Sequence, residues 1–122
     1  MNLTNIAETI PNWINGKECA AVSGKTFQKQ SPHNGQNLYQ VVGANEDDIK
    51  IAIQAARKAQ AAWADMTPVQ RGDMLYEITL AMRNKRQEIA SIVAAETGMS
   101  MKAALGETGG AIAEGEFMAG EG

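Results

Sequence analysis

The sequence has 122 residues, of which 44% are hydrophobic and 20% are charged, as in an ordinary globular domain. The net charge of −3, with Lys and Arg dispersed along the chain, argues against nucleic-acid binding, which needs clustered positive charge. No apolar run approaches the roughly 20 residues that span a bilayer, and the first residues lack a signal-peptide pattern. We therefore expect a soluble cytoplasmic protein that binds neither nucleic acid nor membrane.

The first third of the chain shows the signals of β-hairpins. Residues 1–10 carry little pattern and are predicted to form a loose lead-in. Within residues 11–43, Asn15-Gly16 separates two short strand-like segments and accepts the positive φ angles of a type I′ turn. A second hairpin is predicted between residues 25 and 42, with its turn at residues 32–35.

Residues 44–122 have a helical period instead. Asn45 is a favourable N-cap for a first helix, and Asp48 is placed to complete a capping box. Thr67 caps a second helix, whose first position is taken by Pro68, where the missing N–H costs nothing. Apolar residues then recur at spacings of three and four and give each helix one apolar face. These residues are Ile49, Ile53, Ala56, Ala59 and Trp63 in the first helix, and Met74, Leu75, Ile78, Ala81 and Met82 in the second.

The remaining helices are punctuated by caps and by glycine. Asn84 with Gln87 resembles a further N-cap, which predicts a break or bend there. Gly98 is a C-cap, and Ser100 would cap a last helix. The glycines of that helix each cost up to about 1 kcal/mol relative to alanine. They are tolerable only if another element approaches the backbone closely or the segment is irregular: Gly106, Gly109, Gly110 and Gly115.

The predicted elements form an incomplete unit. The chain ends at Gly122 without capping or a closing element, and no predicted sheet is large enough to cover the apolar faces of the helices. We therefore expect an α+β fragment, with N-terminal β-hairpins followed by three to four helices.

The sequence offers no candidate catalytic or cofactor-binding residue. His33 lies in a predicted turn with no metal-ligating neighbour and is interpreted as an exposed turn residue. Cys19 has no base or helix N-terminus beside it and is interpreted as a small core or edge residue. The spacing of Gly106, Gly109 and Gly110 does not match Gly-x-Gly-x-x-Gly, and no strand precedes them.

The order of several short motifs resembles the opening of the aldehyde dehydrogenase superfamily. The resemblance covers about residues 12–122. Ser31 replaces the Asn that is common in the family. Two further departures are Met99, where the family usually has Lys, and Gly109-Gly110, where many members carry bulkier residues. The motifs are the hairpin Ile14-Asn15-Gly16, the turn from Ser31-Pro32 to Gly35, the first helix ending in Trp63, Thr67-Pro68 with Arg71, Glu96-Thr97-Gly98, Ala104 to Glu107, and Ala119-Gly120.

This resemblance implies the N-terminal part of the Rossmann-like coenzyme-binding domain of an α/β enzyme. The parent enzyme would oxidise an aldehyde to a carboxylic acid with NAD or NADP, and would be a homo-oligomer of two or four subunits. Its cysteine nucleophile, glutamate base and phosphate-binding turn lie downstream in the family. None is assigned in this chain, so we expect the isolated chain to be inactive and to bind no cofactor.

Two further sites follow from the resemblance. Some members hold a monovalent cation through backbone carbonyls, which would place Gln30 (or Lys29) and Glu96 at such a site. The alternative is that Glu96 only ends a helix. The last helix of the family borders the substrate entrance, so Gly110 would lie near a roomy tunnel mouth. A different function also stays open, namely a self-contained helical module that binds a partner protein through residues 44–118.

Overall fold

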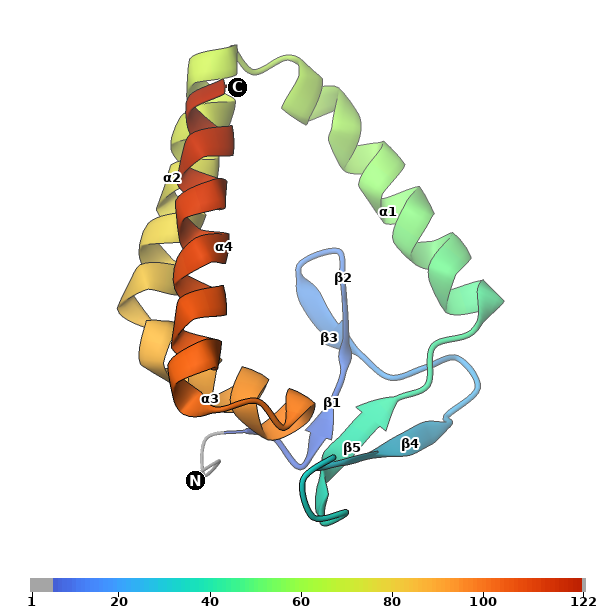
Figure 1. Cartoon of the computed structure of the whole chain (residues 1–122). Coiled ribbons are helices and arrows are strands. Elements are labelled where there is room, and N and C mark those ends of the chain that lie inside the picture. The colour runs from blue at the N-terminus through green and yellow to red at the C-terminus, as the bar shows by residue number, and fades with distance from the viewer. Residues whose placement is uncertain (1–5, 122) are drawn as a thin grey trace. The chain divides into compact units, whose positions relative to one another are not determined.

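The computed structural model describes residues 6–121. In this range short strands come first and helices follow (Figure 1), which confirms the predicted order. The described residues up to Ala62 form one compact unit and those from Trp63 onward form another, so each unit is described by itself. The strands are β1 (Thr9–Ile10), β2 (Asn12–Ile14), β3 (Lys17–Cys19), β4 (Thr26–Gln30) and β5 (Asn37–Val42); the helices are α1 (Glu46–Ala64), α2 (Pro68–Asn84), α3 (Arg86–Thr97) and α4 (Met101–Glu121).

The first hairpin joins β2 to β3 through the predicted Asn-Gly turn. Asn15 has a φ of 54° and Gly16 a φ of 75°, as a type I′ turn requires at both central positions. The strands are antiparallel, with Ile14 opposite Lys17. The turn type predicted from the dipeptide is therefore confirmed.

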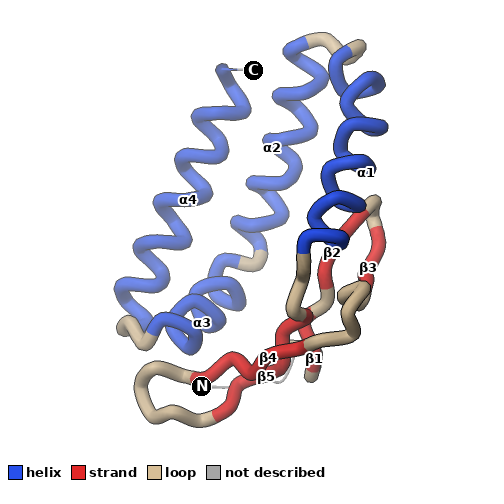
Figure 2. Tube along the Cα trace, turned by 90° about the vertical axis from the view of Figure 1, so that its right-hand side faces the viewer, coloured by secondary structure: helices blue, strands red, loops and turns tan. Residues whose placement is uncertain are grey.

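The second hairpin lies in a sheet with the order β1-β5-β4. The antiparallel β4 and β5 lie side by side (Figure 2), joined by a turn in which Gly35 has a φ of 70°. In that turn Ser31 N–H donates to the carbonyl of Gln36 at 2.9 Å. The parallel pairing of β1 with β5 differs from the expected loose lead-in, because Thr9 and Ile10 alone show no strand period. Residues 1–5 of that lead-in lie outside the described residues.

Helix α1 belongs largely to the same unit as the strands, and its apolar residues are exposed. Exposed fractions are 55% for Ile49, 48% for Ile53 and 39% for Trp63. Helix α2 shows the same property, because Met74, Leu75 and Ile78 are exposed as well. Among the described residues, the predicted apolar faces of both helices are therefore left largely uncovered.

The helices of the second unit begin and end largely as predicted. At the start of α2, Thr67 Oγ1 accepts from Gln70 N–H at 3.3 Å, and Gln70 Oε1 accepts from Thr67 N–H at 2.9 Å, which completes the capping box. Gly98 ends α3 with a φ of 76°, and Ser100 Oγ accepts from Ala103 N–H at the start of α4. The break after α2 is confirmed, but its predicted cap is wrong. Lys85, not Asn84, is the N-cap residue of α3, and it caps without a side-chain hydrogen bond.

Helix α4 is continuous despite its glycines, and it packs closely against α2 (Figures 1 and 2). A Cβ built on Gly115 would lie 2.8 Å from Thr79 Cγ2, and one built on Gly72 of α2 would lie 2.6 Å from the carbonyl oxygen of Ala119. Glycine at these two positions therefore lets the helices approach. The prediction that a nearby element explains the glycine content is confirmed at Gly115.

The core of the second unit consists of small side chains. Ala90 and Ala94 of α3 pack against Ala104 of α4, and Ile112 is buried further along α4. Partly buried aliphatic residues surround this cluster: Val93, Met99, Met101 and Leu105. In the described part of the chain, no helix is both long and apolar enough to cross a membrane.

Candidate functional site

One half of the predicted cation site lies at the end of β4. Gln30 is exposed, and its Nε2 donates to Asn37 Oδ1 across the hairpin at 3.2 Å. The pairing with β5 is irregular between Lys29 and Gln30. At such an irregularity some backbone groups do not take part in the hydrogen bonds between the two strands. A backbone carbonyl in this stretch could therefore serve as a cation ligand.

The other half of that site is Glu96, in the last turn of α3. Glu96 is half-buried, and the last carbonyls of a helix lack partners within it. Nearby, Gly98 N–H donates to the Ala94 carbonyl at 3.0 Å. Gln30 and Glu96 fall in different compact units, and their pairing in one site stays a prediction.

Gly110, the predicted entrance residue, is exposed in the middle of α4. A Cβ built there would meet no atom within 4 Å, and the same holds for Gly106 one turn earlier. Gly109, by contrast, faces Arg86, whose nearest guanidinium nitrogen would lie 2.7 Å from an added Cβ. The packing seen here therefore does not require glycine at 110, and the entrance role stays a prediction.

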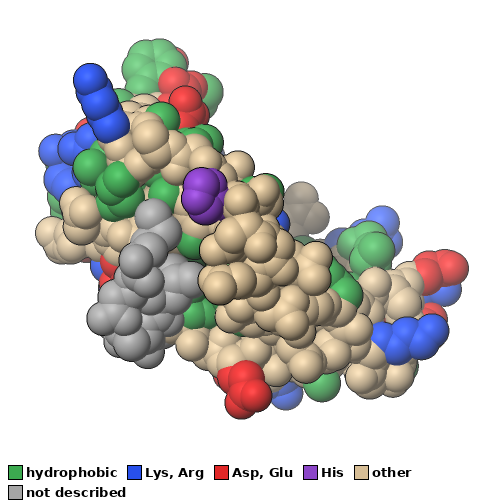
Figure 3. Space-filling view, turned by 60° about the horizontal axis from the view of Figure 1, so that its bottom comes forward, with side chains coloured by type: hydrophobic (Ala, Val, Ile, Leu, Met, Phe, Trp, Pro, Cys, Tyr) green, Lys and Arg blue, Asp and Glu red, His purple; other side chains and the backbone are tan. Residues whose placement is uncertain are grey.

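The two candidate reactive side chains lie in strands and turns. Cys19 is half-buried at the end of β3, and its Sγ lies 3.7 Å from the carbonyl oxygen of Lys17. His33 is exposed in the turn between β4 and β5, and the histidine side chain is visible at the surface in Figure 3. Within residues 6–121, no group of three or more His, Cys, Asp or Glu residues is arranged to hold a metal ion.

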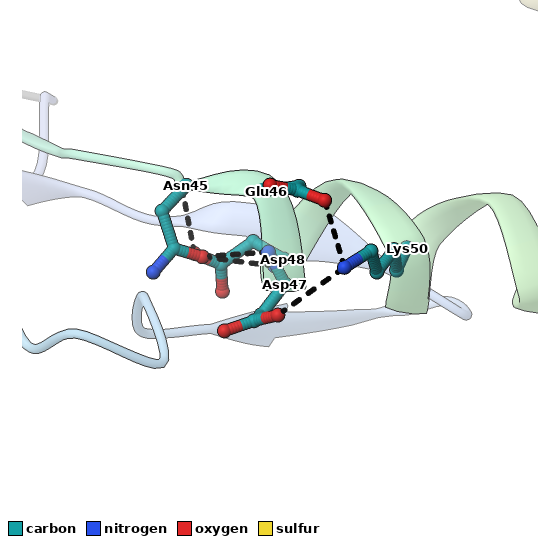
Figure 4. A network of polar contacts seen from close by, with 5 residues as sticks. All are labelled: Asn45, Glu46, Asp47, Asp48 and Lys50. Carbon is teal, nitrogen blue, oxygen red and sulfur yellow. Dashed lines mark hydrogen bonds and ion pairs between the residues drawn. The ribbon is translucent and has the colours of Figure 1, made fainter.

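The start of α1 carries the most extensive polar network of the first unit (Figure 4). Asn45 Oδ1 accepts from the N–H groups of Asp47 and Asp48 at 2.9 and 3.2 Å. The carboxylate of Asp48, only 3% exposed, accepts from Asn45 N–H and from Val22 N–H, both at 2.9 Å. The predicted capping box is confirmed, and Asp48 also ties the loop before β4 to the helix.

A small hollow of 190 Å³ borders this network. The amide Nδ2 of Asn12 is buried without a hydrogen-bond partner among the described residues. Asn12 itself is only half-buried, so the hollow is a packing feature next to the cap and not a built binding site. Its lining residues are Asn12, Trp13, Ile14, Ala44, Asp48, Ile49 and Ala52.

A larger groove of 420 Å³ lies in the second unit, between the start of α2 and the end of α4. Gly72 and Ala119 contribute small residues to it, and Tyr76, Asp73 and Glu116 contribute polar groups. None of its lining residues is a histidine, cysteine or serine. The groove therefore presents a phenol and two carboxylates as its polar groups.

Two arginine contacts in the second unit escape sequence reasoning. Arg83 of α2 forms an ion pair with Glu116 of α4. Arg86 donates from Nη2 to the carbonyl of Leu105 at 2.8 Å, over the space that Gly109 leaves free. The only sequence signal for the second contact is the glycine itself, which marks a place where another group approaches the helix.

The chain matches known proteins along almost its whole length. Residues 19–122 match the model of the aldehyde dehydrogenase family. The chain is 31% identical to alpha-ketoglutaric semialdehyde dehydrogenase of Bacillus subtilis, in an alignment that covers 100% of this chain and 25% of that protein.

Solved structures agree with this match. The NAD⁺ complex of an aldehyde dehydrogenase from Bacillus cereus superposes with a TM-score of 0.89 and 32% identity, over 93% of this chain and 24% of that one. The NAD-dependent aldehyde dehydrogenase from Sinorhizobium meliloti gives a TM-score of 0.89 and 28% identity, over 95% and 24% of the two chains.

The chain thus spans about a quarter of the length of the relatives it matches. These matches do not support the alternative reading as a self-contained helical interaction module. The family assignment follows from the match over residues 19–122, and the observed order of strands and helices agrees with it. The chain belongs to the aldehyde dehydrogenase family and corresponds to an N-terminal segment of it.

Proposed function

We propose that this chain is the N-terminal part of the coenzyme-binding domain of an enzyme that oxidises an aldehyde to a carboxylic acid with NAD or NADP. The observation that carries the proposal is the family match over residues 19–122. The likeness to an aldehyde dehydrogenase solved as its NAD⁺ complex supports a nicotinamide cofactor for the parent enzyme.

The chemistry of the parent requires groups that we do not assign to this segment. A cysteine thiolate attacks the aldehyde carbon, hydride passes to the nicotinamide, and a water activated by glutamate releases the acid. Cys19 does not fit the nucleophile, because it sits in a short hairpin strand with its thiol against the Lys17 carbonyl. We infer that the nucleophile, the base and the phosphate-binding turn belong to the remaining three quarters of the parent.

The segment then acts as scaffold, and its uncovered apolar faces support this role. Ile49 and Ile53 of α1 and Ile78 of α2 are each about half exposed, which is unusual for regular helices of a soluble protein. In the parent these faces pack against later elements. The isolated chain should therefore bind a hydrophobic dye and self-associate, and a monodisperse monomer that binds no dye would contradict this.

The enzymatic part of the proposal is tested on the parent protein. The gene is read beyond Gly122, the full-length product is purified, and reduction of NAD and of NADP is followed with a panel of aldehydes. We expect aldehyde-dependent reduction of one or both cofactors. A parent that reduces neither with any aldehyde of the panel would contradict the proposal.

The predicted minor sites belong to the same proposal. If Gly110 borders the substrate entrance, Gly110→Phe in the parent should raise KM for bulky aldehydes more than for small ones. Gly115→Ala, which changes the packing against Thr79, is the control and should not discriminate by size. If Gln30 and Glu96 contribute carbonyls to a cation site, the parent should melt at a higher temperature in K⁺ or Na⁺ than in a large organic cation.

Assembly and location complete the proposal. We expect the parent to be a cytoplasmic homo-oligomer of two or four subunits. Light scattering of the purified parent measures the first property, and fractionation of the cells that make it measures the second.

A further inference from the structure

The chain contains two Asn-Gly pairs, Asn15-Gly16 and Asn34-Gly35, both in exposed turns. Asn-Gly is the dipeptide in which side-chain deamidation meets the least steric resistance, because glycine has no Cβ to shield its nitrogen. The glycine nitrogen bonds to the asparagine Cγ, the Cγ–Nδ2 bond breaks, and ammonia leaves with the proton from the glycine nitrogen. Water then opens the resulting succinimide to aspartate or isoaspartate, so the reaction needs no other reactant.

The second pair is held by hydrogen bonds on both reacting groups. Asn34 Oδ1 accepts from Gln36 N–H at 3.1 Å, and Asn34 Nδ2 donates to Gln36 Oε1 at 3.0 Å. The attacking group is engaged as well, since Gly35 N–H donates to the Ser31 carbonyl at 2.8 Å. Attack would have to break these contacts first, so the fold protects Asn34.

The first pair has none of these restraints. Asn15 and Gly16 are exposed at the tip of the β2–β3 hairpin. Between residues 6 and 121, neither the Asn15 side chain nor the Gly16 N–H is engaged in a hydrogen bond. The strands that flank this turn have only three residues each, so the hairpin has little pairing to resist local opening.

We propose that Asn15 is a site of spontaneous deamidation in this protein and that Asn34 is protected by its turn. The two products differ in their effect on the hairpin. Aspartate at 15 tolerates the positive φ of the turn and only adds one negative charge to the net charge of −3. Isoaspartate lengthens the backbone of a two-residue turn, so the Ile14–Lys17 register is lost.

The test compares the two pairs in the same molecule. The 122-residue chain is incubated at mildly alkaline pH with and without a concentrated denaturant, and peptides that contain residue 15 or 34 are quantified by mass spectrometry. Under native conditions we expect Asn15 to convert several times faster than Asn34. In denaturant the difference should shrink, because the contacts that protect Asn34 are absent.

Two substitutions show which asparagine gives rise to the first acidic species that an ion-exchange column separates during the incubation. In Asn15→Asp the early acidic species should no longer form, whereas in the matched control Asn34→Asp it should still appear. Conversion at 34 as fast as at 15 under native conditions, no conversion at either site, or a ratio that denaturant leaves unchanged would each overturn the proposal.

Discussion

The two compact units of this chain are stabilised in different ways. In the first, residues 6–62, short strands and one helix are fixed by turns and by a capping box in which the Asp48 carboxylate accepts from two backbone amides. In the second, residues 63–121, small residues let helices α2 and α4 approach closely. Substitutions should therefore act through lost hydrogen bonds in the first unit and through steric overlap in the second.

The largest effect is expected at the closest helix contact. The Cβ that Gly72→Val adds would lie only 2.6 Å from the carbonyl oxygen of Ala119. Helices α2 and α4 must therefore separate. Overpacking of this kind costs about 1–3 kcal/mol or more, measured by urea unfolding followed by far-UV circular dichroism. Gly106→Ala on the open side of α4 is the control, and it should stabilise by up to about 1 kcal/mol. Equal effects from both would contradict the steric account.

The next effect is expected at the start of α1. Asp48→Ala removes the charged acceptor of the Val22 and Asn45 amides, and hydrogen bonds to a charged group contribute about 1.5–3 kcal/mol. The neighbouring Asp47→Ala serves as the matched control, because the Asp47 side chain is exposed and, within residues 6–121, its one ion pair is with Lys50. Its effect should stay within about 0.5 kcal/mol. If Asp48→Ala and Asp47→Ala unfold at the same urea concentration, the hydrogen bonds of Asp48 do not stabilise the unit.

A smaller effect is expected at the cap of α2. Thr67→Ala removes the hydroxyl that accepts from Gln70 N–H at 3.3 Å, which costs typically about 1 kcal/mol. Thr67→Ser keeps an oxygen at this position and should recover most of the loss. The same urea titration measures both variants, and a serine variant as unstable as the alanine variant would point to the methyl group instead.

The smallest effect is expected at the exposed ion pairs of α1. Lys50 lies 2.8 Å from Glu46 and 3.8 Å from Asp47, and all three side chains are mostly exposed. Lys50→Ala should therefore cost no more than about 0.5 kcal/mol, and the cost should vanish in high salt. If Lys50→Ala lowers the free energy of unfolding as much as Asp48→Ala does, the expectation that exposed ion pairs stabilise less than the buried Asp48 carboxylate is wrong.

The features that the sequence predicted correctly are local ones. Asn15-Gly16, the Asn45–Asp48 box and the Thr67 cap each depend on residues no more than three positions apart, and the structure has all of them. Gly98 ends α3 as predicted. Residue type and spacing suffice for such features, because the chain satisfies its own backbone groups over one turn.

The features that escaped prediction depend on distant partners. The pairing of β1 with β5 joins Thr9 to Gln40, and the Arg83–Glu116 ion pair spans 33 positions. The Asn84 cap was predicted wrongly because an asparagine next to a helix break fits the pattern, whereas the helix itself restarts from Lys85. Of the candidate site residues, Gly110 is exposed on α4, and its role at a substrate entrance stays a prediction.

We propose that this segment of an aldehyde dehydrogenase is scaffold and carries none of the chemistry. It is tested most directly by purifying the 122-residue chain from a host without the full-length enzyme and following NADH and NADPH formation with a panel of aldehydes. We predict no formation above the protein-free blank, while the parent at the same molar concentration turns over. Cofactor reduction that rises in proportion to the concentration of the isolated chain would contradict the claim.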